Sequence, residues 1–197
     1  MNQLLRTFIA IDLPAAVTAE LQRRTELLAC ATPRGSVRWG RADQIHLTLK
    51  FLGDVESRRI EAITTALGEA LRDSHAFELT LAGNGAFPSL DRPRVLWAGV
   101  EMRDETLSAL QSAVEESMAG LGYARETRPF SPHLTLGRVR EGSGAVYLRA
   151  VREAIAAPLD RPALDFLASR VVLFRSQLRP EGALYSSLAQ FELEARA

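Results

Sequence analysis

Two of the chain's three histidines lie in the same tetrapeptide, and this repeat is the strongest sign of chemistry in the sequence. The letters His-Leu-Thr-Leu occur at 46–49 and again at 133–136, each inside an apolar run typical of a β-strand. Because successive side chains of a strand point to opposite faces, each histidine shares a face with its threonine. With a rise of about 3.3 Å per residue, the imidazole and the hydroxyl emerge about 6–7 Å apart, which leaves room for a phosphate group.

Two such strands facing one cleft would supply both an acid and a base. The unperturbed pKa of histidine, about 6.5, allows one of His46 and His133 to be neutral and the other protonated near neutral pH. General acid and general base catalysis each typically contribute about 10²–10⁴-fold. The hydroxyls of Thr48 and Thr135 can donate hydrogen bonds to phosphate oxygens. A single His-x-Thr is more typical of a solvated or core-edge histidine, but two identical copies favour a shared site.

Composition and charge limit the classes of protein to consider. The 197 residues are 47% hydrophobic and 24% charged, as in ordinary globular domains. Basic and acidic residues number 24 each, so the formal net charge is zero. Non-specific clamping of long nucleic acid by a strongly basic surface is therefore not indicated, although a local basic groove remains compatible with this balance.

Neither metal nor cofactor chemistry is indicated by the motifs. Cys30 is the only cysteine, so the chain has no intrachain disulfide and no cysteine-based zinc site, and no other ligand spacing suggests a metal. No glycine-rich nucleotide loop is present. The N-terminal apolar stretch contains Arg6 and Asp12, unlike a signal peptide, and no apolar run approaches the length of a membrane span. We expect a cytoplasmic protein without a membrane association.

Helical and strand periodicities alternate along the chain and predict an α+β fold with mainly antiparallel sheets. The pattern places each motif strand in one half of the sequence, followed by a helix and a pair of strands. We therefore expect residues 1–197 to form one two-lobed, pseudo-duplicated catalytic domain, with helices outside and a central cleft between the lobes. The expected helices are about 15–30, 57–72, 104–120 and 145–156, and the expected strands include 7–13, 45–52, 77–87, 94–102, 164–178 and 184–193.

The sequence also resembles a known family, the two-histidine (2H) phosphoesterases, which are defined by two His-x-Thr-x motifs. Within it the chain is similar to bacterial RNA 2',3'-cyclic phosphodiesterases, long described as 2'-5' RNA ligases. The resemblance covers nearly the whole chain, and it implies that the two motifs face each other across a groove. The stretches that carry it are Arg6–Pro14, His46–Gly53, Pro93–Val100 and Phe130–His133.

The resemblance implies roles for two residues that each lie five positions after a motif histidine. Arg138 would bind the phosphate, and Phe51 would stack on the terminal nucleobase. Strict alternation places both on the face away from the histidines, but a bulge at Gly137 could turn Arg138 back. Core packing is the competing interpretation of Phe51. The even offset of Lys50 places it on the His46 face, where we expect it in solvent.

The resemblance implies hydrolysis of a 2',3'-cyclic phosphate at an RNA 3' end, without metal or cofactor, to give a 2'-phosphate. We take His46 as the proton donor to the leaving 3' oxygen and His133 as the proton acceptor from water. Thr48, Thr135 and Arg138 would hold the phosphate oxygens as charge develops. The reverse direction would join an RNA 5'-hydroxyl in a 2'-5' linkage without ATP. The expected partners are RNAs with cyclic ends, tRNA fragments among them, and the expected state is a monomer.

Two other functions remain open from the sequence. The first is a phosphodiesterase that acts on 2'-5' oligoadenylate or on a small cyclic nucleotide. The second is an RNA-end binding protein whose histidines only hold phosphate. Turnover separates the binder from both enzymes, and the choice of substrate separates the two enzymes.

Overall fold

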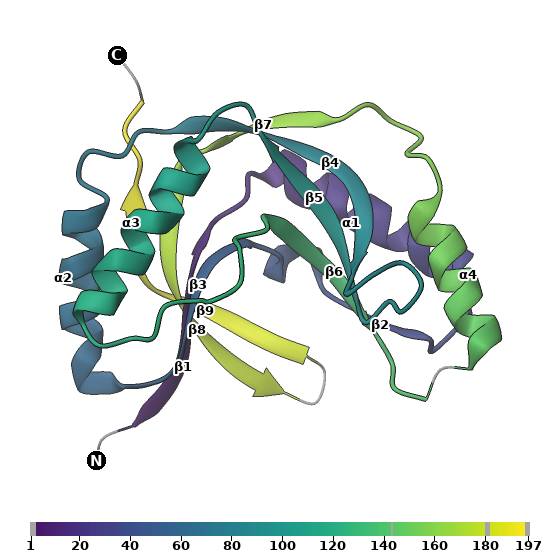
Figure 1. Ribbon diagram of the computed structural model, residues 1–197, viewed down its shortest axis with the longest axis horizontal. Coiled ribbons are helices and arrows are strands. Elements are labelled where there is room, and N and C mark those ends of the chain that lie inside the picture. Colours follow the sequence, from purple (N-terminus) through teal and green to yellow (C-terminus); the bar gives the residue numbers. More distant parts are fainter. Residues whose placement is uncertain (1–2, 143, 180–181, 196–197) are drawn as a thin grey trace.

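A computed structural model describes residues 3–142, 144–179 and 182–195, which form two antiparallel sheets (Figure 1). The first sheet has the strand order β3-β1-β8-β9, and the second has the order β2-β6-β5-β4-β7. The strands of the first sheet are β1 (Leu4–Ile11), β3 (Leu47–Glu56), β8 (Arg170–Arg179) and β9 (Gly182–Glu192). Those of the second are β2 (Val37–Trp39), β4 (Phe77–Phe87), β5 (Val95–Met102), β6 (His133–Val139) and β7 (Leu164–Ala168).

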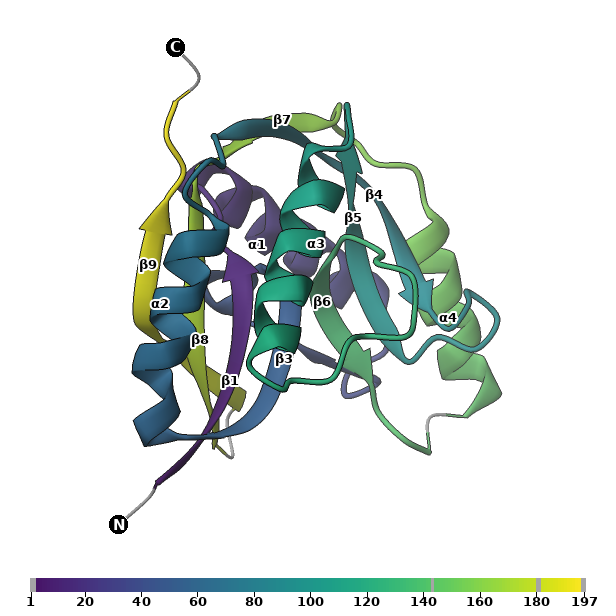
Figure 2. The same ribbon diagram turned by 60° about the vertical axis from the view of Figure 1, so that its left-hand side comes forward.

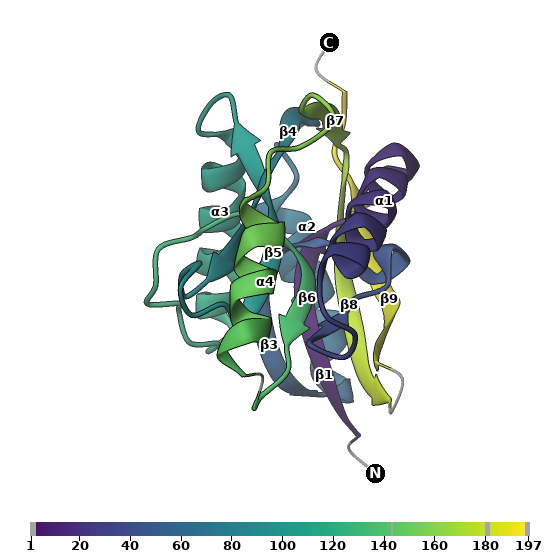
Figure 3. The ribbon, with the colours of Figure 1, turned by 90° about the vertical axis from the view of Figure 1, so that its right-hand side faces the viewer.

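Helices cover the outer side of each sheet. On the first sheet these are α2 (Ile60–Ala70) and α3 (Thr106–Gly120), and on the second α1 (Ala15–Ala31) and α4 (Ala145–Ala156), as Figures 1 and 3 show. Two short 3-10 turns, η1 (Ala42–Gln44) and η2 (Ser57–Arg59), precede β3 and α2. The predicted α+β class with antiparallel sheets and outer helices is confirmed.

The two sheets exchange strands between the two halves of the sequence. The first motif strand, β3, shares a sheet with the β8–β9 hairpin from the end of the chain. The second motif strand, β6, shares a sheet with the β4–β5 pair, which directly follows the first motif and its helix. The chain therefore crosses between the sheets several times, and neither sheet can form from one half alone.

The crossing explains the one strand that the sequence pattern joined wrongly. The single strand expected over 164–178 is divided at Ser169 into β7, which pairs with β4, and β8, which pairs with β1. Because the chain leaves one sheet and enters the other within one residue, the apolar pattern continues through the break. The three-residue strand β2, which pairs with β6, lies outside the strands expected from the sequence, since so short a strand gives no periodic signal.

The leucines of both motifs reach the core, as the alternation predicts. Leu47, Leu49, Leu134 and Leu136 are all buried. They belong to one continuous hydrophobic cluster that spans both sheets and their helices. Burial of each leucine contributes about 1.5–3 kcal/mol, so the core fixes which face of each motif strand is left for the histidine and threonine.

Candidate active site

Each motif strand contains a β-bulge at the same letter of the repeat. In β3, Thr48 pairs with Ala10 of β1 but Lys50 pairs with the next residue, Ile9, which leaves Leu49 as the extra residue. In β6, Thr135 pairs with Trp97 of β5, the pairing resumes at Gly137, and Leu136 is the extra residue. An extra residue on one strand reverses the alternation of side chains beyond it.

The bulges bring both residues at the fifth position onto the motif faces. Thr48 and Phe51 pair with Ala10 and Phe8, two residues that are two positions apart in β1 and therefore share a face. In the second sheet, His133, Thr135 and Arg138 pair with Gly99, Trp97 and Val95, which also share a face. The bulge expected beside Gly137 is confirmed, and β3 contains its counterpart.

The exposure of these two side chains agrees with the register. Phe51 is 69% exposed, so the competing interpretation of core packing is wrong. Its ring lies 5.9 Å from that of Phe8, on the same face of the first sheet. Arg138 is exposed, and no ion pair forms on it among the residues that the structure describes. Both side chains are therefore free to meet a ligand.

The same bulge overturns the expectation for Lys50. Lys50 was expected on the His46 face and in solvent, but the bulge at Leu49 turns it to the opposite face, where it is only 5% exposed. Its Nζ donates hydrogen bonds to Oε2 of Glu115 at 2.6 Å and to the carbonyl oxygen of Ala124 at 2.8 Å. Lys50 thus joins the first motif strand to α3 and to the loop that leads into the second motif.

His46 lies directly before β3, among aromatic rings of the first sheet. Its ring stacks on Phe8 with centroids 4.4 Å apart, forms a T-shaped contact with Tyr185 at 4.9 Å and lies 5.5 Å from the ring of Phe174. Burial lowers the pKa of His46 to about 4, and a hydrogen bond to the backbone of Gln44 only partly opposes the shift. The imidazole is therefore neutral at pH 7 in the ligand-free protein.

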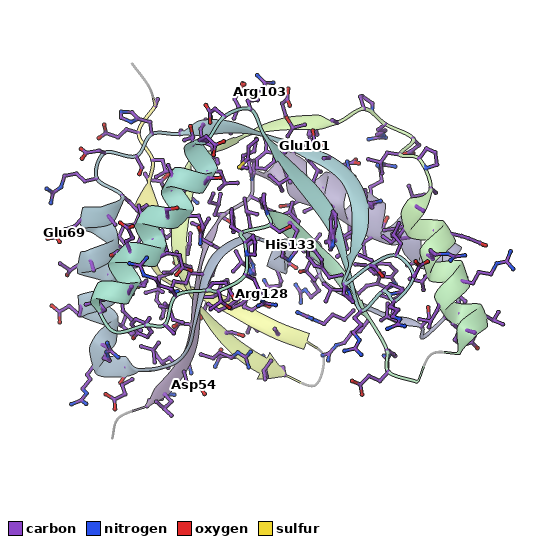
Figure 4. All side chains as sticks on the ribbon, in the orientation of Figure 1. Asp54, Glu69, Glu101, Arg103, Arg128 and His133 are labelled. Atoms are coloured by element: carbon purple, nitrogen blue, oxygen red, sulfur yellow. The ribbon has the colours of Figure 1, made fainter. Side chains whose placement is uncertain are left out.

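His133 is the first residue of β6 and lies near the middle of the molecule (Figure 4). Its Nδ1 lies 2.7 Å from the carbonyl oxygen of Ser131. Because a carbonyl only accepts, this contact places a proton on Nδ1 and leaves Nε2 for other partners. Its ring meets Phe87 edge-on at 4.9 Å. In both motifs, the histidine ring therefore makes a hydrogen bond to the backbone of the residue two positions earlier, Gln44 or Ser131.

The motif strands of the two sheets approach each other. Some Cα atoms of β3 lie within 8 Å of Cα atoms of β6. In Figure 2, β6 lies next to β3, which is the edge strand of the first sheet. Tyr185 of β9 provides a second link between the two motifs. Its ring packs against His46, and the positive charge of Arg138 acts on the pKa of its phenol. Burial raises the pKa of this phenol, and the positive charges of Arg138 and Arg6 oppose the rise. Arg138 of the second motif thus lies near the surroundings of His46.

Several residues of this site were not predicted. Phe8, Phe87, Phe174 and Tyr185 surround the two histidines, yet each comes from a strand other than the motif strands. Only Phe8 falls in a stretch that the family resemblance singled out. The others lie in ordinary strand patterns, and only the pairing of distant strands brings them to the histidines.

The described residues contain no group of three or more His, Cys, Asp or Glu side chains that could hold a metal ion. In the same part of the chain, no helix is both long and apolar enough to cross a membrane.

Comparison with known proteins gives one consistent result. The family model of the 2'-5' RNA ligase superfamily matches residues 13–179. The RNA 2',3'-cyclic phosphodiesterase of Methanothermobacter thermautotrophicus is 32% identical over 188 residues, which cover 95% of this chain and 98% of the relative. The enzyme of the same name from Escherichia coli is 28% identical over 193 residues, covering 98% of this chain and 99% of the relative.

Solved structures agree with these relatives. The protein TT0787 of Thermus thermophilus superposes with a TM-score of 0.77 at 26% identity, covering 98% of this chain and 100% of its own. Escherichia coli LigT complexed with 3'-AMP superposes with a TM-score of 0.72 at 26% identity, covering 97% of this chain and 99% of its own. The resemblance read from the sequence is confirmed, and the chain belongs to the 2'-5' RNA ligase superfamily of 2H phosphoesterases.

Proposed function

We propose that this protein hydrolyses the 2',3'-cyclic phosphate at an RNA 3' end and leaves a 2'-phosphate. The observation that carries the proposal is the pair of matched bulges, which turn Phe51 and Arg138 to the faces of the two His-x-Thr motifs. Relatives that share most of the chain are named RNA 2',3'-cyclic phosphodiesterase, and this supports the choice of substrate.

Phosphate binding is assigned to three residues. The guanidinium of Arg138 is exposed on the His133 face, and its planar fork suits two phosphate oxygens at once. Thr48 and Thr135 each lie two residues after a motif histidine, on the same face of the strand. Their hydroxyls can donate hydrogen bonds to the remaining phosphate oxygens. These groups would stabilise the charge that develops as the phosphorus is attacked.

The two imidazoles would divide the proton transfers. Nε2 of His133, left free by the contact of Nδ1 with Ser131, takes a proton from water as its oxygen attacks the phosphorus. The bond from phosphorus to the 3' oxygen breaks, and His46 donates the proton that this oxygen requires. The products are a 2'-phosphate and a 3'-hydroxyl. With an RNA 5'-hydroxyl in place of water as the nucleophile, the same proton transfers would form a 2'-5' linkage without ATP.

The surroundings of His46 add a requirement to this assignment. Burial keeps its imidazole neutral in the ligand-free protein, so His46 cannot donate a proton at pH 7 before substrate binds. A bound phosphate carries negative charge, which favours the imidazolium form. We infer that His46 takes up its proton together with the substrate.

Phe51 would stack on the terminal base, since its ring is exposed on the motif face. RNAs with cyclic ends, tRNA fragments included, are the proposed substrates. We propose that the protein acts as a monomer and that it works in the cytoplasm.

The test is incubation of the purified protein with an RNA oligonucleotide that ends in a 2',3'-cyclic phosphate, with EDTA and without ATP, followed by separation of 2'- from 3'-phosphate products. We expect a 2'-phosphate from the unmutated protein, formed about 10²–10⁴-fold more slowly by His46→Ala and by His133→Ala. An intact cyclic end with the unmutated protein would refute the proposal. Tight binding of that RNA without turnover would identify an RNA-end binding protein instead.

A further inference from the structure

Tyr185 lies on the motif face of the first sheet, although it is far from both motifs in the sequence. In the register of the sheet, Arg6 of β1 pairs with Ser176 of β8, and Ser176 pairs with Tyr185 of β9. Paired residues share a face, so these three form a row beside the one that contains Phe8 and Phe174. This is the face on which the ring of Phe8 stacks against His46.

The ring of Tyr185 is held firmly in place. It meets Phe8 and His46 edge-on, with centroid distances of 5.0 and 4.9 Å. Its backbone N–H donates to Oε1 of Gln44 at 2.7 Å, just before the first motif. The position of the ring is therefore set by contacts that do not involve the hydroxyl.

The hydroxyl has no such partner. Among the residues that the structure describes, it makes no hydrogen bond, although the side chain is half-buried. Its two charged neighbours, Arg138 and Arg6, are cations that cannot accept its proton. A hydroxyl whose ring is packed against a motif histidine, and on which two positive charges act, is a good arrangement for binding an anion.

We propose that the Tyr185 hydroxyl is a further phosphate-binding group, which donates a hydrogen bond to a non-bridging oxygen of the phosphate held by Arg138. The inference rests on the proposed function, because it assigns Tyr185 to the same phosphate. A bound phosphate would supply an acceptor for this hydroxyl, which none of the described residues provides. This assignment makes β9, a strand from the end of the chain, part of the same site as the two motifs.

The test compares Tyr185→Phe, which keeps the ring and removes only the hydroxyl, with Tyr147→Phe on the exposed face of α4 as the matched control. The first measurement is the affinity of each protein for inorganic phosphate, by calorimetry. We expect Tyr185→Phe to weaken binding about tenfold or more, as for a lost hydrogen bond to a charged group, and Tyr147→Phe to leave it unchanged. The value of kcat/KM on the cyclic-ended RNA should fall by a similar factor.

Equal phosphate affinity in Tyr185→Phe and the unmutated protein would overturn the inference, as would absence of phosphate binding by the unmutated protein. The NMR titration of His46 in the ligand-free variant is the second readout. An unchanged titration supports direct contact with phosphate, whereas a shifted one would show that the hydroxyl acts through His46. If the unmutated protein binds phosphate but leaves the RNA end intact, the proposed function fails while the comparison of affinities still decides the role of Tyr185.

Discussion

The two motif strands have a β-bulge at the same position but differ in the side chains that follow it. In both, the fourth letter of the tetrapeptide is the bulged residue, Leu49 in β3 and Leu136 in β6. Beyond the bulge, β3 turns Lys50 inward and Phe51 outward, whereas β6 turns Gly137 inward and Arg138 outward. One local device thus presents an aromatic ring on one side of the site and a cation on the other.

The inward positions differ for a packing reason. Lys50 reaches a carboxylate on α3, whereas Gly137 pairs with Trp39 of the neighbouring strand β2, where an added Cβ would lie 2.9 Å from side-chain atoms of Trp39 and Val37. Only a residue without a side chain lets β2 pair closely with β6 at this point. The histidines differ as well, since three aromatic rings surround His46 and the described aromatic contact of His133 is with Phe87. Identical letters therefore do not make the two halves of the site equivalent.

Removing either histidine should have the largest effect. His46→Ala and His133→Ala should each lower kcat about 10²–10⁴-fold on the cyclic-ended RNA, since each removes one proton-transfer group. The double variant should lose little more than the single ones, because residues that act as a unit are not additive. Single-turnover kinetics measures all three, and strictly multiplicative losses would show that the histidines act independently.

Breaking the buried ion pair should cost about 3–5 kcal/mol of unfolding free energy. Lys50→Met leaves the carboxylate of Glu115 buried without its cation, which is expensive in a low-dielectric interior. The double variant Lys50→Met/Glu115→Leu should recover most of the loss. Urea denaturation measures the free energy, and a single variant within about 1 kcal/mol of the unmutated protein would contradict the role given to this pair.

The burial of His46 should make stability depend on pH. Its folded pKa of about 4 lies below the unfolded value of about 6.5, so the unfolded state binds more protons between them. This contribution is fully present above pH 6.5 and is lost as pH falls towards 4, by at most about 3 kcal/mol. His46→Gln should remove that part of the profile of unfolding free energy against pH. The same slope in both proteins would mean that His46 is not the source.

Proton uptake by His46 gives a smaller signal that is specific to the first motif. Binding of inorganic phosphate near pH 7 should take up part of a proton, because phosphate favours the imidazolium of a residue that starts neutral. Calorimetry in buffers of different ionisation enthalpy measures the uptake, and His46→Gln should lower it. An equal proton uptake in both proteins would contradict the inference that His46 becomes protonated when substrate binds.

Loss of the Phe51 ring should have the smallest effect. Phe51→Ala should raise KM for the RNA by an amount that corresponds to about 1–3 kcal/mol of base stacking, with kcat little changed. Phe51→Trp is the matched control, because it keeps an aromatic face at the same position. If alanine and tryptophan give the same KM as the unmutated protein, Phe51 does not touch the base.

Much of the fold followed from periodicity. The strand over 77–87 and the helix over 145–156 have the predicted bounds, because their apolar patterns end at clear turn residues. The candidate site was partly defined from the sequence as well: the repeat indicated His46, Thr48, His133 and Thr135, and the family resemblance indicated Phe51 and Arg138, whose roles stay predictions. The break at Ser169, the short strand β2 and the inward turn of Lys50 were not, because each depends on which distant strand pairs alongside.

The sequence by itself determined the motifs, the burial of their leucines and the class of fold, because these depend on letters a few positions apart. Tertiary structure alone decided how the two halves exchange strands, which ring lies against which histidine, and that His46 is neutral while a tyrosine near the end of the chain lies beside it. The physical reason is the range of the interactions. Alternation and helical periodicity are local, whereas desolvation and strand register are set by segments that meet only in the folded chain.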